Sequence, residues 1–250
     1  MKIIVCIKQV PDTETRIRIS ENRKTIDTSE INWILNPYDE FAVEEALRIK
    51  EKGDGGDMVI VITAGPERTT TALRSALAMG ADEAIRIHVE EYLDPLATAN
   101  VLADVLRNME FDLLLFGKQA VDDDNFQVGT LVAEKLELPC ITAVTKLTLE
   151  HGKVSVRREL ESGAEVILTT MPAVLTAEKG LNDPRYPALR GIMMAKKKII
   201  DVREGRASVP IIVVTGYQYP PERKGGKIVG NGQEAVPELV RLLREEAKVI

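Results

Sequence analysis

Apolar residues follow two alternating patterns along the first half of the chain. Near-continuous apolar runs at Ile3–Ile7, Met58–Thr63 and Leu113–Phe116 are typical of strands that are covered on both faces. Apolar residues at helical spacing line one side of 42–49 and of 99–106, between these runs. The alternation predicts an α/β fold, with a Rossmann-like parallel sheet of the adenine-nucleotide-binding type and crossover helices.

The pattern changes in the middle of the chain. Ala84–Val89 alternates apolar and polar residues, which predicts a strand near an edge with one face less buried. Alternation in Thr145–Leu149 and Val154–Arg157 around His151-Gly152 predicts an antiparallel edge hairpin. Glu165–Thr170 reads as a further strand that joins this hairpin, although the pattern does not identify its pairing partner.

The last part of the chain has the composition of an extended C-terminal arm. A strand-like run at Ile211–Val214 precedes a Pro- and Gly-rich stretch at 219–232, and an amphipathic helix begins near Val236. We therefore expect an α/β nucleotide-binding domain at 1–205 and a C-terminal arm with a helix at 206–250. The pattern alone leaves open whether the helix docks on its own body or on a partner subunit.

Two Pro-containing pairs mark helix starts. Asn36-Pro37 and Asp94-Pro95 each place a capping residue before a first-turn proline. We expect both side chains to cap their helices.

Composition narrows the class of protein. The 250 residues carry a net charge of −6 and 4% aromatic residues, which argues against nucleic acid as a partner. Cys6 and Cys140 are far apart, so we expect neither a disulfide nor a metal cluster, and a reducing compartment fits best. We expect the prokaryotic cytoplasm, with the mitochondrial matrix as the alternative that the sequence leaves open. The first apolar run is too short to be a membrane span, and we expect no membrane insertion.

The stretch Gly117–Gly129 is the main candidate for chemistry. Neither a GxGxxG motif nor a P-loop occurs, so a nucleotide would have to be held in another way. The stretch follows a predicted central strand, where open α/β sheets bind ligands, and a helix opening near Asn125 would direct unpaired amides at a phosphate. A capped surface loop explains the composition equally well, with the three aspartates capping the helix and binding no metal.

No catalytic residue is predicted. His88 and His151 have no nucleophile motif or metal-ligand spacing around them.

Four separated segments make the chain resemble the β subunit of electron transfer flavoproteins. They are Val5–Asp12, Asn36–Ala46, Gly117–Gly129 and Leu181–Lys198. The resemblance implies an electron carrier subunit that is not itself an enzyme. It implies an obligate heterodimer with an α subunit, whose mobile domain carries the redox-active FAD.

The resemblance also implies a structural AMP in this subunit. The residues that it places around the nucleotide are Cys6, Asn36, Pro37, Tyr38, Asp39, Ala64, Gly117, Lys118, Gln119, Ala120, Val121, Asp122, Asp123, Asp124, Asn125, Phe126, Gln127 and Val128. It further implies that Tyr38 borders the flavin of the partner.

Three other residues resemble partner contacts of the family. Glu159 matches an acidic residue that pairs with the moving flavin domain. Leu189, together with Tyr186, matches a loop that docks acyl-CoA or other flavin dehydrogenases, whose electrons then pass to a quinone reductase or another acceptor. The chain departs from the common form at Asn125-Phe126 and at Arg190-Gly191. The second departure leaves the identity of the dehydrogenase open.

Two alternatives remain. Some relatives bifurcate electrons and hold a second FAD in place of AMP, although the unbroken run Asp122–Asp124 favours AMP. The other alternative is a stand-alone adenine-nucleotide-binding module without a partner.

Overall fold

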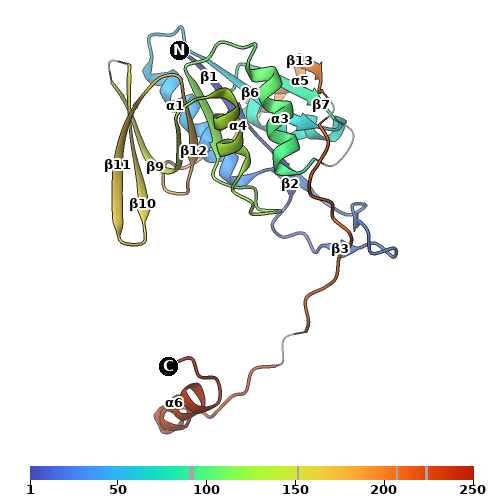
Figure 1. Ribbon diagram of the computed structural model, residues 1–250, viewed down its shortest axis with the longest axis vertical. Helices are drawn as coiled ribbons and strands as arrows, with labels where there is room; N and C mark the ends of the chain where they lie inside the picture. Colours follow the sequence, from blue (N-terminus) through green and yellow to red (C-terminus); the bar gives the residue numbers. More distant parts are fainter. Residues whose placement is uncertain (90–92, 151, 207, 223–224) are drawn as a thin grey trace.

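The computed structural model describes the whole chain except residues 90–92, 151, 207 and 223–224. It contains a nine-stranded sheet with the order β11-β10-β9-β12-β8-β1-β6-β7-β13 (Figure 1). The strands are β1 (Lys2–Cys6), β6 (Met58–Gly65), β7 (Glu83–His88), β8 (Leu113–Gly117), β9 (Cys140–Glu150), β10 (Lys153–Leu160), β11 (Gly163–Thr170), β12 (Ala173–Ala177) and β13 (Ile200–Glu204). All neighbours from β9 to β13 pair in parallel, which confirms the predicted fold class.

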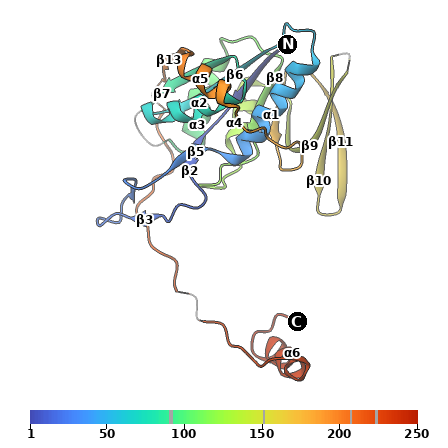
Figure 2. The same cartoon turned by 180° about the vertical axis from the view of Figure 1, so that it is seen from behind.

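Helices cover both faces of the sheet. They are α1 (Pro37–Lys52), α2 (Thr70–Met79), α3 (Pro95–Leu106), α4 (Val128–Leu136) and α5 (Leu189–Lys197). Helices α3 and α4 lie on the face seen in Figure 1, and α1, α2 and α5 lie on the face seen in Figure 2. Alternate residues of β1 enter the two cores, with Ile3 and Val5 on the α1 side and Ile4 and Cys6 on the other. A central parallel strand is thus buried on both faces, as its apolar run predicted.

The order of the strands creates a topological switch point. From β1 the chain steps outward through α1 to β6 and through α2 to β7, and then returns to β8 on the other side of β1. The connections that leave the carboxyl ends of β1 and β8 therefore run in opposite directions. Open α/β sheets bind ligands in the crevice that opens at such a point.

The predicted antiparallel hairpin is confirmed. Strand β9 pairs with β10 so that Leu149 lies opposite Val154 and Leu147 lies opposite Val156. Strand β11 pairs with β10, which supplies the pairing partner that the sequence did not reveal. Residue His151, which the sequence places in the turn, lies outside the described residues.

Strand β7 matches its prediction in part. It lies next to the edge, with β13 outside it. However, Arg86 on its polar face is only 9% exposed. Its guanidinium donates to the carbonyl oxygen of Gly65 at 3.2 Å, and this hydrogen bond lowers the cost of burying the side chain. The prediction of a less buried face was therefore wrong at Arg86.

Short and edge strands were missed by the sequence patterns. Strands β12 and β13 join the main sheet, while β2 (Gln9–Pro11) pairs with β5 (Trp33–Leu35) and β3 (Arg18–Ile19) pairs with β4 (Ile26–Asp27). Strand β12 lies between β8 and β9 and is buried along its whole length. Two of its five residues are alanine, which is depleted in strands, so its signal is weaker than that of β1 or β8.

The arm begins along the body and then leaves it. The predicted strand at Ile211–Val214 was wrong, because the backbone amides of Ile211 and Ile212 donate to Asp94 Oδ2, at 2.7 and 2.9 Å, instead of to a neighbouring strand. Further along, the amide of Tyr217 donates to the carbonyl oxygen of Arg23 at 2.8 Å. Beyond this contact the arm extends to the 3-10 turn η2 (Gln233–Ala235) and helix α6 (Val236–Glu245), which lie away from the body in Figures 1 and 2.

No helix in the described part of the chain is both long and apolar enough to cross a membrane.

Candidate functional site

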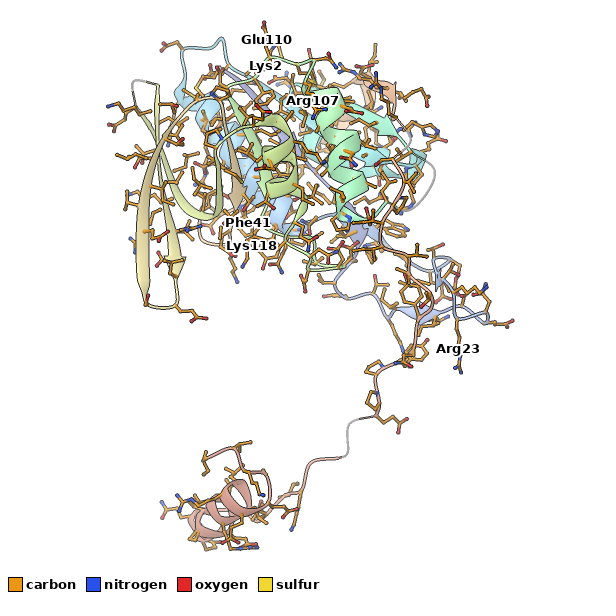
Figure 3. All side chains as sticks on the ribbon, in the orientation of Figure 1. Lys2, Arg23, Phe41, Arg107, Glu110 and Lys118 are labelled. Carbon is orange, nitrogen blue, oxygen red and sulfur yellow. The ribbon has the colours of Figure 1, made fainter. Side chains whose placement is uncertain are left out.

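The candidate site lies at the carboxyl ends of the parallel strands. Figure 3 places Lys118, which follows β8, on the side of the body from which the arm extends, whereas Lys2, at the start of β1, lies at the opposite end. Cys6 ends β1, Ala64 lies near the end of β6, and Asn36 immediately precedes α1. The structure thus brings the sequence-predicted nucleotide residues to one end of the sheet.

A buried carboxylate ties the crevice together. Asp39, in the first turn of α1, is 5% exposed, and its two oxygens accept from the amides of Lys8 at 2.6 Å and Gly117 at 3.0 Å. Burial raises the pKa of Asp39 to about 7, against the opposing effect of these hydrogen bonds. One side chain therefore joins α1 to the ends of β1 and β8.

Cys6 is unsuited to nucleophilic chemistry. Its thiol is buried, and burial together with the nearby Asp39 carboxylate raises the pKa of Cys6 well above its ordinary value. The reactive thiolate is therefore suppressed at neutral pH.

Asn36 holds the loop after β8 and does not cap its helix. Its side-chain nitrogen donates to the carbonyl oxygen of Gln119 at 2.9 Å, and its Oδ1 accepts from the amide of Val121 at 3.2 Å. Helix α1 begins at Pro37 with Asn36 at the N-cap position, as predicted, but the side chain of Asn36 makes no cap hydrogen bond because these bonds use it. Asp94 does cap α3 as predicted, with Oδ1 accepting from the amide of Ala97 at 2.7 Å.

The aspartate triplet is fastened by neighbours on both sides. Lys8 Nζ contacts Asp122 Oδ1 at 2.7 Å and Asp123 Oδ2 at 3.0 Å, while Asp124 Oδ1 accepts from Gln119 Nε2 at 2.6 Å. Burial lowers the pKa of Lys8, but the two carboxylates outweigh that effect and the net pKa is raised. The triplet thus shapes the loop through Lys8, and the prediction that it caps the following helix was wrong.

Helix α4 begins later than predicted and with an open N-terminus. It begins at Val128, not near Asn125, because Asp124 and Phe126 have φ values of 49° and 56°, which interrupt a right-handed helix. Gln127 occupies the N-cap position without a side-chain hydrogen bond to the helix. The first-turn amides of α4 are therefore left without that cap, and they carry the positive end of the helix dipole.

Lys118 and Gly129 lie on either side of the loop that leads into α4. Lys118 Nζ pairs with Glu178 at 2.5 Å and lies 5.6 Å from the centre of the Phe126 ring. A Cβ on Gly129 would lie 3.0 Å from Thr176 Cγ2, so a glycine lets α4 pack closely on β12. Both nearby lysines, Lys8 and Lys118, are already paired with carboxylates, and the uncapped first-turn amides of α4 remain as donors for an anion.

The predicted partner contacts lie outside the crevice and apart from one another. Glu159 is on β10, near one edge of the sheet, and its carboxylate pairs with Arg157 at 3.1 Å. Leu189 begins α5, which packs on α2 near the other edge, and Leu189 and Tyr186 are 76% and 97% exposed. These positions suit surface contacts but do not belong to the nucleotide crevice.

Several residues of the site were missed by sequence reasoning. Lys8 and Glu178 were absent from the predicted set, although each follows a buried strand at its carboxyl end, and that position is the signal that could have identified them. Arg68, which lies 3.6 Å over the Trp33 ring and donates to Gln9, was also missed. Its partners come from distant segments, and no local pattern connects them.

Comparison with known proteins identifies relatives over the full chain. A family model described as the electron transfer flavoprotein domain matches residues 24–207. The electron transfer flavoprotein subunit beta of Bacillus subtilis (strain 168) is 41% identical over 262 residues, covering 100% of both chains. The protein of the same name from Homo sapiens is 38% identical over 257 residues, covering 100% of this chain and 99% of its own. That from Thermoanaerobacterium thermosaccharolyticum is 42% identical, with 97% and 98% coverage.

Proposed function

This chain belongs to the electron transfer flavoprotein family, as a β subunit, and from that premise we propose that it is the AMP-binding half of a heterodimeric electron carrier. The observation that supports this proposal most directly is the open N-terminus of α4 at the switch-point crevice. Amides of a helix N-terminus bind phosphate well, and their position beside β8 is where α/β sheets bind nucleotides.

The donor set fits a nucleoside monophosphate. The amides of the first turn of α4 can hold one phosphate group, while Lys8 and Lys118 are already neutralised by carboxylates. Additional phosphate charge would meet the acidic loop at Asp122–Asp124, which disfavours a longer phosphate chain. In this arrangement the nucleotide stiffens the loop, and Asn36 and Asp39 hold that loop against α1.

The redox chemistry belongs to FAD in the α subunit. Bound FAD would supply the electron acceptor and donor, and this chain would supply the surface against which the flavin-bearing domain moves. Tyr38, half-buried in the first turn of α1, borders the flavin, and Glu159 contacts the moving domain. Dehydrogenases such as acyl-CoA dehydrogenases dock at Tyr186 and Leu189, and the electrons pass to a quinone reductase. The heterodimer works in the cytoplasm.

The test is to co-express the chain with its α subunit and to quantify the nucleotides released on denaturation. One FAD and one AMP per heterodimer is the expected result. Two FAD would replace this proposal with an electron-bifurcating enzyme. A stable monomer with AMP and no flavin would replace it with a stand-alone nucleotide-binding module.

A further inference from the structure

The segment 181–188, called the docking loop below, is fastened to α1 mainly through Asn182 and Arg185, with a further bond from Arg48 Nη2 to the carbonyl oxygen of Asp183 at 3.4 Å. It connects β12 to α5. Asn182 Nδ2 donates to the carbonyl oxygen of Phe41 at 3.0 Å and to Glu45 Oε2 at 2.9 Å. Three residues later, the guanidinium of Arg185 binds the carboxylates of Glu44 and Glu51. The loop therefore lies along one face of the helix whose first turn lines the crevice.

The second fastening has the geometry of a strong ion pair. Arg185 Nε and Nη2 donate to the two oxygens of Glu44 at 2.7 and 3.2 Å, and its backbone amide donates to Glu44 Oε2 at 3.2 Å. The Glu44 side chain is 4% exposed. Two guanidinium nitrogens on one carboxylate fix the orientation of Arg185 as well as its position.

The pair remains ionised at neutral pH. Burial alone would raise the pKa of Glu44, but the hydrogen bonds from Arg185 and Arg48 outweigh it and the net pKa is lowered. Hydrogen bonds from Arg185 likewise lower the pKa of Glu51, and both carboxylates raise that of Arg185. Both sides of the ion pair therefore stay charged at neutral pH.

Large apolar side chains project from this fixed backbone. Tyr186 directly follows Arg185 and is 97% exposed, and Leu189 is 76% exposed. Apolar side chains that are already held in position lose less conformational entropy when a partner buries them. Tyr is also among the residues that contribute most to protein interfaces.

We propose that Arg185 is a positioning residue, which holds the docking loop on α1 so that Tyr186 and Leu189 are preorganised to enter an apolar groove of a dehydrogenase. This inference rests on the proposed docking function of the loop. It adds a role for Glu44 and Glu51, whose carboxylates bind the guanidinium of Arg185.

The experiment compares heterodimers that carry Arg185→Gln, Arg107→Gln or Leu189→Ala with the wild type. Glu44 keeps Arg48 as a partner at 2.9 Å in Arg185→Gln, so the variant should fold. Arg107 is the matched control, because it lies at the end of α3 on the other face of the sheet and pairs with Asp104 (Figure 3). Amide exchange of 181–189, AMP content, and KM and kcat with a flavin-dependent acyl-CoA dehydrogenase are measured.

For Arg185→Gln we expect amide exchange in the docking loop to be about tenfold faster, and KM for the heterodimer to rise by about five- to tenfold with kcat within about twofold. AMP content should not change, and Arg107→Gln should match the wild type. Arg185→Lys should give intermediate values, because one ammonium cannot reproduce the two-point contact with Glu44.

The outcomes separate the two levels of the proposal. If amide exchange in the docking loop of Arg185→Gln is unchanged, the positioning role is overturned. It is also overturned if Arg185→Gln exchanges faster but keeps the wild-type KM, while Leu189→Ala raises KM. A rise in KM for Arg185→Gln with none for Leu189→Ala would instead remove Leu189 from the proposed docking contact and leave the positioning role standing through Tyr186.

Discussion

Asp39 is buried and forms no ion pair with any residue that the structure describes, and its two oxygens accept from the backbone amides of Lys8 and Gly117. Its pKa is about 7 in the folded chain and 3.8 ordinarily. Between about pH 4 and pH 7 the folded chain therefore holds a proton that the unfolded chain has lost, and stability falls as pH rises. Asp39→Asn removes this titration. The free energy of unfolding of Asp39→Asn minus that of the wild type should therefore grow by up to about 4 kcal/mol as the pH rises from about 4 to about 7. Above that range the difference should stay constant.

Chemical denaturation of the two proteins at a series of pH values measures this difference. The Cγ resonance of Asp39 in a ¹³C titration provides a direct check, because its midpoint should lie near pH 7. A relative stability that does not change between about pH 4 and pH 7 would contradict the assignment.

Gly117 is required by a close approach and not by its backbone angles. A Cβ at this position would overlap Asp39 Oδ1 and lie 2.7 Å from the backbone nitrogen of Asp39. Gly117→Ala should destabilise the chain by about 2–4 kcal/mol, because the strand end must move and the hydrogen bond to Asp39 is lost. Gly56→Ala is the control, since no atom lies within 4 Å of its added Cβ. Equal denaturation midpoints for the two variants would refute this explanation.

At the scale of elements, Asp94 connects α3 to the arm. One oxygen caps α3 at Ala97, and the other accepts from the amides of Ile211 and Ile212. Asp94→Ala should therefore release the base of the arm and fray the first turn of α3 together. We expect amide exchange to be faster by about tenfold or more at 95–98 and at 208–214.

The control for this prediction is Asp104→Ala on the same helix. Asp104 pairs with Arg107 at the surface and has no described contact with the arm. An exchange rate at 208–214 that changes equally in both variants would show that Asp94 is not the anchor.

The elements that could be predicted from the sequence are those with a local signal. Strands β1, β6 and β8 are continuous apolar runs, and α1 and α3 carry apolar stripes with a proline at the start. Strand β12 has a weaker signal, because two of its five residues are alanine, and its position between β8 and β9 is set by tertiary packing. The run at 211–214 has strand composition, but its amides are used by Asp94, so a tertiary contact overrides the propensity.

The candidate site was predictable as a region but not in its connections. The region 117–128 was predicted because it follows a central strand, and the individual residues came from the resemblance to the family. The ties from Asn36 to the loop and from Lys8 to Asp122 cross 83 and more residues of sequence. Such pairs are fixed by the packing of distant segments, and neither periodicity nor capping rules describe them. The start of α4 was also placed too early, because the positive φ angles of Asp124 and Phe126 have no signal in the local sequence pattern.

At the scale of the whole molecule, the candidate functions are distributed over different surfaces. The crevice lies at the carboxyl end of the sheet, Glu159 near one edge, and Tyr186 and Leu189 near the other. The α1 helix connects two of these surfaces, because its first turn holds the crevice loop and its later turns hold the docking loop. A substitution in the docking loop should therefore leave the crevice loop in place as long as α1 remains intact.

Substitutions in the C-terminal helix α6 can test whether the arm joins the chain to a partner. Val236, Leu239 and Val240 form its apolar stripe and are 51%, 43% and 37% exposed, so the body does not bury them. Leu239→Lys should weaken association with the α subunit by about tenfold or more, because a charge replaces an apolar contact. Glu245→Lys introduces the same residue on the opposite face, where loss of an exposed ion pair to Arg241 should change affinity by less than about threefold. Sedimentation measures both dissociation constants, and equal effects of the two variants would exclude the stripe as the contact surface.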